Sequence, residues 1–236
     1  MTSCLHALFA LLPILFAASC STVSTHHSAA AVTTKWSVLF DGTSTEAWRG
    51  YRQEKFPSKH WKVENRMLTT VLGVGGNDLE TKEFFRDFEL ELEWKISPGG
   101  NSGIIYRVSE EYEAPGMAAP EMQVLDDRRH PDGKNPKTTA GALYGLIAPS
   151  QTKALKPVGE WNQVRIIVHH SHVEHWLNGI KVVEYEMNSP ELNALVSSSK
   201  FASYRHFAKT AAGPICLQHH LDAVWYRKIR VRRLLP

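Results

Sequence analysis

The chain has few cysteines, which excludes a disulfide network as the source of its stability. Only three of its 236 residues are cysteine, and two of them, Cys4 and Cys20, lie near the N-terminus. The third, Cys216, stands between two apolar residues, where we expect it to be a small buried hydrophobic side chain. A folded domain in this chain must therefore be stabilised by its hydrophobic core.

The sequence also lacks a strong charge of either sign. The formal net charge is +3, and 43% of the residues are hydrophobic and 22% charged, ordinary values for a globular protein. Basic residues are scattered, apart from a short run at residues 227–233 that we interpret as a solvated strand edge. We therefore expect no nucleic-acid partner.

Long hydrophobic runs are missing too. The apolar run at residues 5–18 is too short to span a bilayer and is typical of a signal peptide. It ends in small residues directly before Cys20, as in a bacterial lipobox. We therefore predict a signal peptide over residues 1–19 and a lipid on Cys20, with a plain signal peptide as the alternative. The protein is then exported and held on the periplasmic or cell-surface face of a bacterial membrane by this lipid only, or else secreted.

Two further segments follow from composition. Residues 20–34 are rich in Ser, Thr, Ala and His, and this composition predicts a flexible tether. Residues 35–236 contain no second linker and no internal repeat, so we predict one folded domain there.

The pattern in this domain predicts β-structure. Residues 88–94 alternate strictly between apolar residues and glutamates, the period of a strand with one covered face. Asn178-Gly179 predicts a hairpin turn between strands at 172–177 and 180–187. A short helix should begin after Ser189 as its N-cap, with Pro190 in its first turn. Further strands are expected at residues 61–70, 103–109, 121–126, 142–147, 161–170, 214–220 and 224–234.

Many short strands, regular turn signals and one short helix predict an all-β fold, namely an antiparallel jelly-roll β-sandwich. Alternation also groups polar side chains. Glu121 and Gln123 share one face of their strand, and Gln218 and His220 share one face of theirs, with His219 opposite.

Eight segments, in this order, resemble the 3-keto-disaccharide hydrolase family. The resemblance covers nearly all of residues 36–234 and implies a concanavalin A-like lectin/glucanase fold whose concave face holds a sugar site. The segments are LFDGTSTEAWRG (39–50), GGNSGIIYRV (99–108), EMQVLDD (121–127), AGALYGL (140–146), GEWNQVRI (159–166), VEHWLNG (173–179), SSKF (198–201) and GPICLQHH (213–220).

The resemblance implies cleavage of a glycoside that a separate sugar 3-dehydrogenase has already oxidised at C3. A ketone at C3 acidifies the hydrogen on C2. A base can remove that hydrogen, an enolate forms, the group on C1 departs, and water then adds. Such a site needs a base, an acid for the leaving oxygen, and a donor or positive charge for the enolate.

Matching the family's segments implies roles for particular residues. Glu121 is the first choice for base or metal ligand, His220 for acid, base or ligand, and Arg107 for polarising the ketone or pinning Glu121. A divalent metal on Glu121 and His220 is left open, and no other cofactor is expected. The residues implied to bind the oligosaccharide or glycoside substrate are Asn101, Gln123, Asp126, Tyr144, Lys200 and Gln218.

Other interpretations remain open at this stage. The domain can be a non-catalytic, lectin-like carbohydrate-binding domain at the cell surface, since that function shares the fold and needs no catalytic pair. A glucanase can use carboxylates on one strand face, but the central Asp of the glucanase pattern is missing, so we interpret the glutamates at 89, 91 and 93 as a wet outer face. The histidines at 169, 170, 172 and 175 suggest a metal cluster, but we favour a solvated sheet face.

Overall fold

The computed structural model describes Met1 and residues 33–235. The predicted signal peptide, the lipid site at Cys20 and nearly all of the predicted tether lie outside the described residues. Among the residues that are described, no helix is both long and apolar enough to cross a bilayer.

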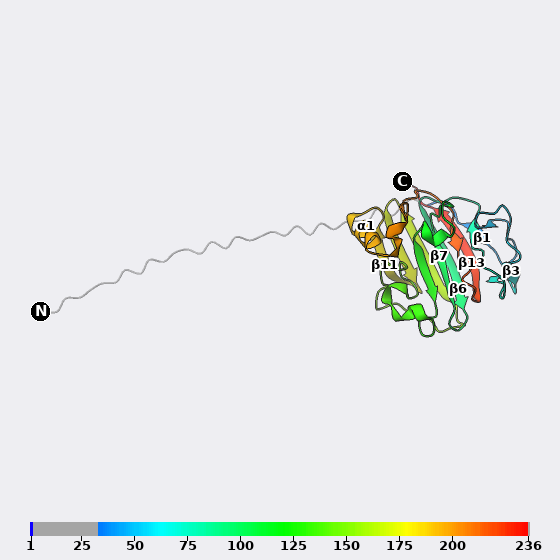
Figure 1. The fold of residues 1–236 in the computed structure, drawn as a ribbon, viewed down its shortest axis with the longest axis horizontal. Helices are drawn as coiled ribbons and strands as arrows, with labels where there is room; N and C mark the ends of the chain where they lie inside the picture. The colour runs from blue at the N-terminus through cyan, green and yellow to red at the C-terminus, as the bar shows by residue number, and fades with distance from the viewer. Residues whose placement is uncertain (2–32, 236) are drawn as a thin grey trace. The chain divides into compact units, whose positions relative to one another are not determined.

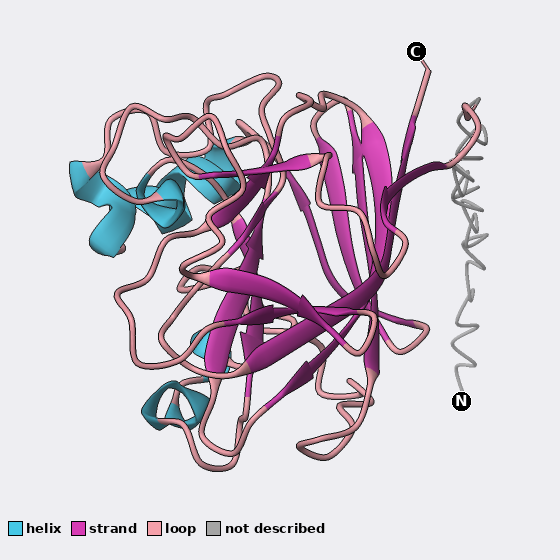
Figure 2. Cartoon of the chain, turned by 90° about the vertical axis from the view of Figure 1, so that its right-hand side faces the viewer, coloured by secondary structure: helices cyan, strands magenta, loops and turns pink. Residues whose placement is uncertain are grey.

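The domain consists of two antiparallel sheets packed face to face, as the sequence predicts (Figures 1 and 2). The larger sheet has eight strands in the order β11-β10-β9-β6-β13-β4-β3, with β1 paired to β13. Their bounds are β1 Ser37–Phe40, β3 Trp61–Glu64, β4 Met67–Thr70, β6 Phe88–Ile96, β9 Asn162–His169, β10 His172–Leu177, β11 Ile180–Glu186 and β13 Val224–Arg233.

The smaller sheet has five strands in the order β2-β5-β12-β7-β8. Its strands are β2 Trp48–Gly50, β5 Leu79–Thr81, β7 Asn101–Ile105, β8 Glu121–Leu125 and β12 Cys216–Leu217. The described residues contain one α-helix, α1 at Pro190–Ser197, and the short 3-10 turns η1 Pro115–Met117, η2 Pro131–Lys134, η3 Pro136–Thr138 and η4 Lys200–Ser203. Figure 2 shows these helical turns lying outside the strand layers.

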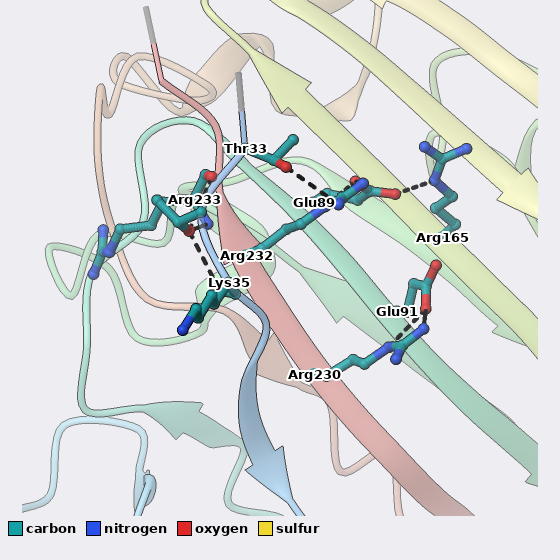
Figure 3. A network of polar contacts seen from close by, with 9 residues as sticks. Thr33, Lys35, Glu89, Glu91, Arg165, Arg230, Arg232 and Arg233 are labelled. Atoms are coloured by element: carbon teal, nitrogen blue, oxygen red, sulfur yellow. Dashed lines mark hydrogen bonds and ion pairs between the residues drawn. The ribbon is translucent and has the colours of Figure 1, made fainter. Parts of the chain in front are cut away.

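Strand β6 shows how alternation builds the sandwich. Its apolar residues, such as Leu90 and Trp94, are buried in the core between the sheets, and each buried side chain of this size stabilises the fold by about 2 kcal/mol. The glutamates lie on the outer face, as interpreted, but Glu89 and Glu93 are buried there, and Glu91 is partly exposed. Figure 3 shows Glu89 between Arg165 and Arg232, and Glu91 against Arg230. These ion pairs leave Glu89 only 3% exposed.

The predicted turn and cap are confirmed. Asn178 and Gly179 both adopt positive φ between β10 and β11, at 49° and 82°. The Ser189 hydroxyl accepts a hydrogen bond of 3.1 Å from the backbone N–H of Leu192, which starts α1. These two local signals therefore fix the register and the direction of the chain after β10.

Four strand predictions need correction. The segment at 61–70 is a hairpin of β3 and β4, because Asn65 and Arg66 both have positive φ, and the strand predicted at 214–220 shortens to Cys216–Leu217. Residues 142–147 form a tight turn with an isolated bridge between Leu143 and Ile147, and Gly145 at a φ of 73° prevents an extended strand there. The strand predicted at 103–109 runs instead from Asn101 to Ile105, since Arg107 has a φ of 52° and turns the chain. The short strands β1, β2 and β5 were not predicted.

Candidate active site

The outer face of the five-stranded sheet presents its side chains in rows that the strand register defines. In an antiparallel sheet, residues paired across neighbouring strands point to the same face. One such row crosses β5, β12, β7 and β8 at Glu80, Cys216, Ile105 and Glu121. The next row contains Asp78, Gln218, Gly103 and Gln123.

Gly103 leaves a hollow in the middle of these rows. A Cβ atom at this position would lie 2.6 Å from Glu121 Cδ and 2.8 Å from Glu121 Cγ, and it would be closer still to the carboxyl oxygen. The Glu121 side chain therefore leans across the strand into the space that a missing side chain leaves.

A pocket of about 240 Å³ opens above this hollow. It brings together residues from strands, turns and η4 that lie up to 142 positions apart in the chain, from Asp78 to His220. Seven residues that the sequence analysis named for the site line it: Asn101, Glu121, Gln123, Tyr144, Lys200, Gln218 and His220. Glu121 and His220, for which the family resemblance implies catalytic roles, therefore face the same pocket.

Glu121 is only 7% exposed. Burial raises the pKa of its carboxyl to about 8, although the Lys200 charge opposes this, and the nearby carboxylates of Asp78 and Asp132 raise it further. At neutral pH this group is therefore mostly protonated and can donate a proton.

Asp78 is a lining residue that the sequence analysis missed. Burial raises the pKa of its carboxyl to about 6. The backbone N–H of His219 donates a 2.7 Å hydrogen bond to this carboxyl and lowers the pKa, but by less than burial raises it. At neutral pH Asp78 is therefore mostly ionised while Glu121 is mostly protonated. One pocket thus holds a carboxylate and a carboxylic acid.

Two amide oxygens in the pocket lack partners. Asn101 Oδ1 and Gln123 Oε1 are buried and accept no hydrogen bond from any described residue. The Gln123 amide is oriented by its nitrogen, which donates to Thr138 O at 3.2 Å. An unsatisfied buried acceptor costs about 1–3 kcal/mol, so hydroxyl groups of a ligand would find favourable partners here.

Tyr144 and Lys200 form one wall. The Lys200 ammonium lies 4.2 Å from the centre of the Tyr144 ring, and the Tyr144 hydroxyl donates to Asp132 at 3.3 Å. The positive charge is thus held near the pocket, where it acts against the rise in the pKa of Glu121.

The two neighbouring histidines separate as alternation predicts. His220 is half-exposed at the rim, with its Nδ1 3.8 Å from Asp222 Oδ2. His219 lies on the other side, buried edge-on against Trp61 at 5.8 Å between ring centres. His219 is therefore a packing residue, while His220 is open to a ligand.

The placement of Arg107 and Asp126 corrects the sequence analysis. Arg107 lies outside the pocket and donates to Arg86 O at 2.6 and 2.8 Å and to His170 O at 3.0 Å. Its positive φ turns its side chain away from Glu121, so it cannot pin that carboxylate. The Asp126 carboxylate accepts from Gly99 N at 2.7 Å and from Arg128 N at 3.1 Å, and it holds the turns at the end of β8 instead of facing the pocket.

The geometry also bears on metal binding. Among the described residues, one set of three side chains has ligand atoms within 4.8 Å of one another, namely His172, Glu174 and Glu184 on the larger sheet. Lys181 already pairs with two of the three, at 3.1 Å from Glu174 and 2.7 Å from Glu184. The four-histidine cluster is not formed, because His175 is buried in the core and bonded to Tyr106 at 2.7 Å. Glu121 and His220 belong to no such set of three among these residues.

A β-sandwich whose pocket contains two carboxyl groups, amides and an aromatic wall is suited to a sugar ligand, and comparison with known proteins shows the class of protein. Residues 35–232 match the 3-keto-α-glucoside-1,2-lyase-like domain, so the chain belongs to that family. It is 35% identical over 226 residues to a 3-keto-disaccharide hydrolase of Bacteroides thetaiotaomicron, a match that covers 83% of this chain and 77% of that protein.

Solved structures show the same fold. A protein of Parabacteroides distasonis proposed to be a glycosyl hydrolase superposes with a TM-score of 0.78 at 27% identity, covering 85% of this chain and 94% of the other. The catalytic domain of an endo-1,3-β-glucanase from Thermotoga petrophila gives a TM-score of 0.50 at 12% identity, covering 86% and 99%, a likeness of fold alone. The protein is thus a hydrolase that acts on glycosides.

Proposed function

We propose that this hydrolase acts on glycosides carrying a ketone at C3, 3-keto disaccharides above all, and cleaves them by elimination followed by hydration. The observation that carries the proposal is the pair of carboxyl groups, Asp78 and Glu121, which face one small pocket in different protonation states. The family match and the name of the Bacteroides relative support the substrate class.

We assign the base to Asp78 and the acid to Glu121, which revises the expectation that Glu121 is the base. The base takes the C2 hydrogen as a proton, and the electrons of that bond form an enolate with its charge on O3. The enolate then re-forms the carbonyl, a C1–C2 double bond forms, and the C1–O bond breaks while the leaving oxygen takes the Glu121 proton. Water then gives its hydroxyl to C1 and a proton to Glu121, and Asp78 returns its proton to C2, so both groups are restored and the net change is hydrolysis.

The remaining lining residues have supporting tasks in this proposal. Lys200 lies where a positive charge balances the enolate, and Asn101 and Gln123 accept hydrogen bonds from sugar hydroxyls. His220 at the rim lies where the leaving group would depart. A divalent metal on Glu121 and His220 is not required by these steps.

The proposed reaction also requires another reaction before it. The C3 ketone must be introduced first, so a separate sugar 3-dehydrogenase must supply the substrate. We further propose that the protein works outside the cytoplasm as a lipid-anchored protein, a proposal supported by the lipobox-like segment ending at Cys20.

The test is aglycone release from a panel of 3-keto glucosides, with the unoxidised glucosides as substrate controls and with and without a chelator. Glu121→Gln and Asp78→Asn should each lower kcat/KM by about 10²-fold or more, whereas Glu160→Gln, an exposed carboxylate outside the pocket, should not. Elimination also predicts that unreacted substrate or product gains deuterium at C2 in heavy water. Binding of plain glycans with no release from any keto substrate would establish the lectin-like alternative instead.

A further inference from the structure

The outer face of the eight-stranded sheet carries a second and larger groove, of about 1110 Å³. Its floor is formed by β6 and β13, one wall by β9, β10 and the residues beside them, and the other wall by β1 and the turn between β3 and β4. It shares no lining residue with the candidate active site, which lies on the other sheet.

Two tryptophans in this groove hold arginines against their rings. The Arg227 guanidinium lies 3.9 Å from the centre of the Trp161 ring, and that of Arg165 lies 5.6 Å from the Trp176 ring. Each arginine is also tethered through Nε, Arg227 to Glu93 at 2.6 Å and Arg165 to Glu89. The terminal nitrogens of both guanidinium groups donate no hydrogen bond to any described residue. The guanidinium groups of Arg165 and Arg227, called the two forks below, are therefore held in place with their terminal nitrogens free to bind a ligand.

The charge of the groove selects the kind of ligand. Five basic side chains line it against three acidic ones. One of them, Arg66, donates to a backbone carbonyl, and its guanidinium pairs with no carboxylate among the described residues. The groove therefore has an excess of positive charge and favours an anion.

The spacing of the two forks favours a polymer over a small anion. Arg165 on β9 pairs with Glu91 of β6, and Arg227 on β13 pairs with Glu93. Two strand spacings of about 4.8 Å and two residues of about 3.4 Å therefore place the two positions about 12 Å apart. One small carboxylate cannot reach both forks. A chain with repeated carboxylates can.

We propose that this groove binds a segment of a uronate polysaccharide. The guanidinium forks match its carboxylates in a bidentate way, and the tryptophans offer apolar surface to the sugar rings between them. A groove of about 1110 Å³ that crosses several strands has room for a segment of an extended chain. The groove then holds the protein on a polymer while the pocket on the other sheet remains accessible.

The test is electrophoresis of the full-length protein in native gels that contain polygalacturonate, with dextran gels as the neutral control. Arg165→Gln and Arg227→Gln should each weaken retardation about tenfold in apparent Kd. Both variants should fold, because Glu89 keeps its partner Arg232 and Glu93 keeps Lys228. The matched control is Arg128→Gln, which removes an exposed charge outside the groove.

Trp161→Ala should weaken retardation as well, and added salt should abolish it. Release of aglycone by the pocket should stay unchanged in all of these variants. A failure of the groove proposal, measured as gel retardation, can therefore be distinguished from a failure of the proposed function, measured as aglycone release. The proposal is overturned by equal migration in both gels, by an equal loss in Arg128→Gln, or by binding to anionic vesicles that matches binding to polygalacturonate.

Discussion

Gly103→Ala is the most direct test of how the candidate active site is built. The added methyl group would stand 2.6 Å from Glu121 Cδ and 2.8 Å from Glu121 Cγ, whereas unstrained contacts of this kind exceed about 3.4 Å. Because the obstacle is a side chain, Glu121 must swing out by about 1 Å or the sheet must distort. We expect a loss of about 1–3 kcal/mol in unfolding free energy from this overpacking.

The larger effect should fall on activity. A displacement of about 1 Å in a catalytic group can cost about 10²-fold in rate, so kcat for release from a 3-keto glucoside should fall by that order in Gly103→Ala. The measurement pairs this rate with Tm from thermal unfolding.

Gly75→Ala is the matched control, since a Cβ there meets no atom within 4 Å and the residue has no positive φ. Its rate and Tm should be those of the wild type.

A double-mutant cycle separates the effect of the steric clash on stability from the effect of the Glu121 position on activity. Adding Glu121→Asp to Gly103→Ala shortens the clashing side chain, so Tm should recover while activity stays low. Wild-type turnover in Gly103→Ala would refute the reasoning, because it would mean that the position of the Glu121 carboxyl does not matter to the reaction.

Three further predictions concern titration, the core and the N-terminus. The pKa of the Glu121 carboxyl is about 8 in the folded protein, so the unfolded state ionises first and the wild type loses stability as pH rises from about 4.5 to 8. The difference in Tm between Glu121→Gln and the wild type should therefore grow in favour of the variant across that pH range and stay level above it. A difference in Tm that does not change with pH would contradict this. Burial lowers the pKa of His175 to about 4, so the folded state loses stability as pH falls from 6.5 to 4, and His175→Gln should flatten this acid limb in urea titrations. Cys20→Ala should abolish labelling with a radioactive fatty acid and move the protein out of the membrane fraction, whereas Cys4→Ala should change neither.

Much of the site was predictable because alternation is a property of the backbone. In β8 the period of two places Glu121 and Gln123 on one face whatever their neighbours are, and the same holds for Gln218 and His220 beyond β12. The family resemblance added Asn101, Tyr144 and Lys200, which no local pattern brings to this pocket.

The misses have physical causes of their own. Asp78 precedes β5, a strand of three residues that are all buried, so neither alternation nor length distinguishes it. Its place opposite Gln218 depends on pairing between β5 and β12, which are more than 130 residues apart in the chain. Arg107 fails differently. A non-glycine residue at positive φ breaks the period of two, and the sequence gives no sign of it.

The location of the pocket follows from side-chain lengths on one face of a sheet and from the turns beside it. A short side chain among long ones leaves a depression on that face, and residues of η1 and η4 stand around the depression. On the outer face of the five-stranded sheet the short position is Gly103, and Glu121, Gln123 and Gln218 stand around it. This small hollow also explains the protonation of Glu121, since a carboxyl that leans into the space above a glycine loses water on most sides. The same missing side chain therefore gives Glu121 its place at the pocket and its raised pKa, the two properties that the proposed acid needs.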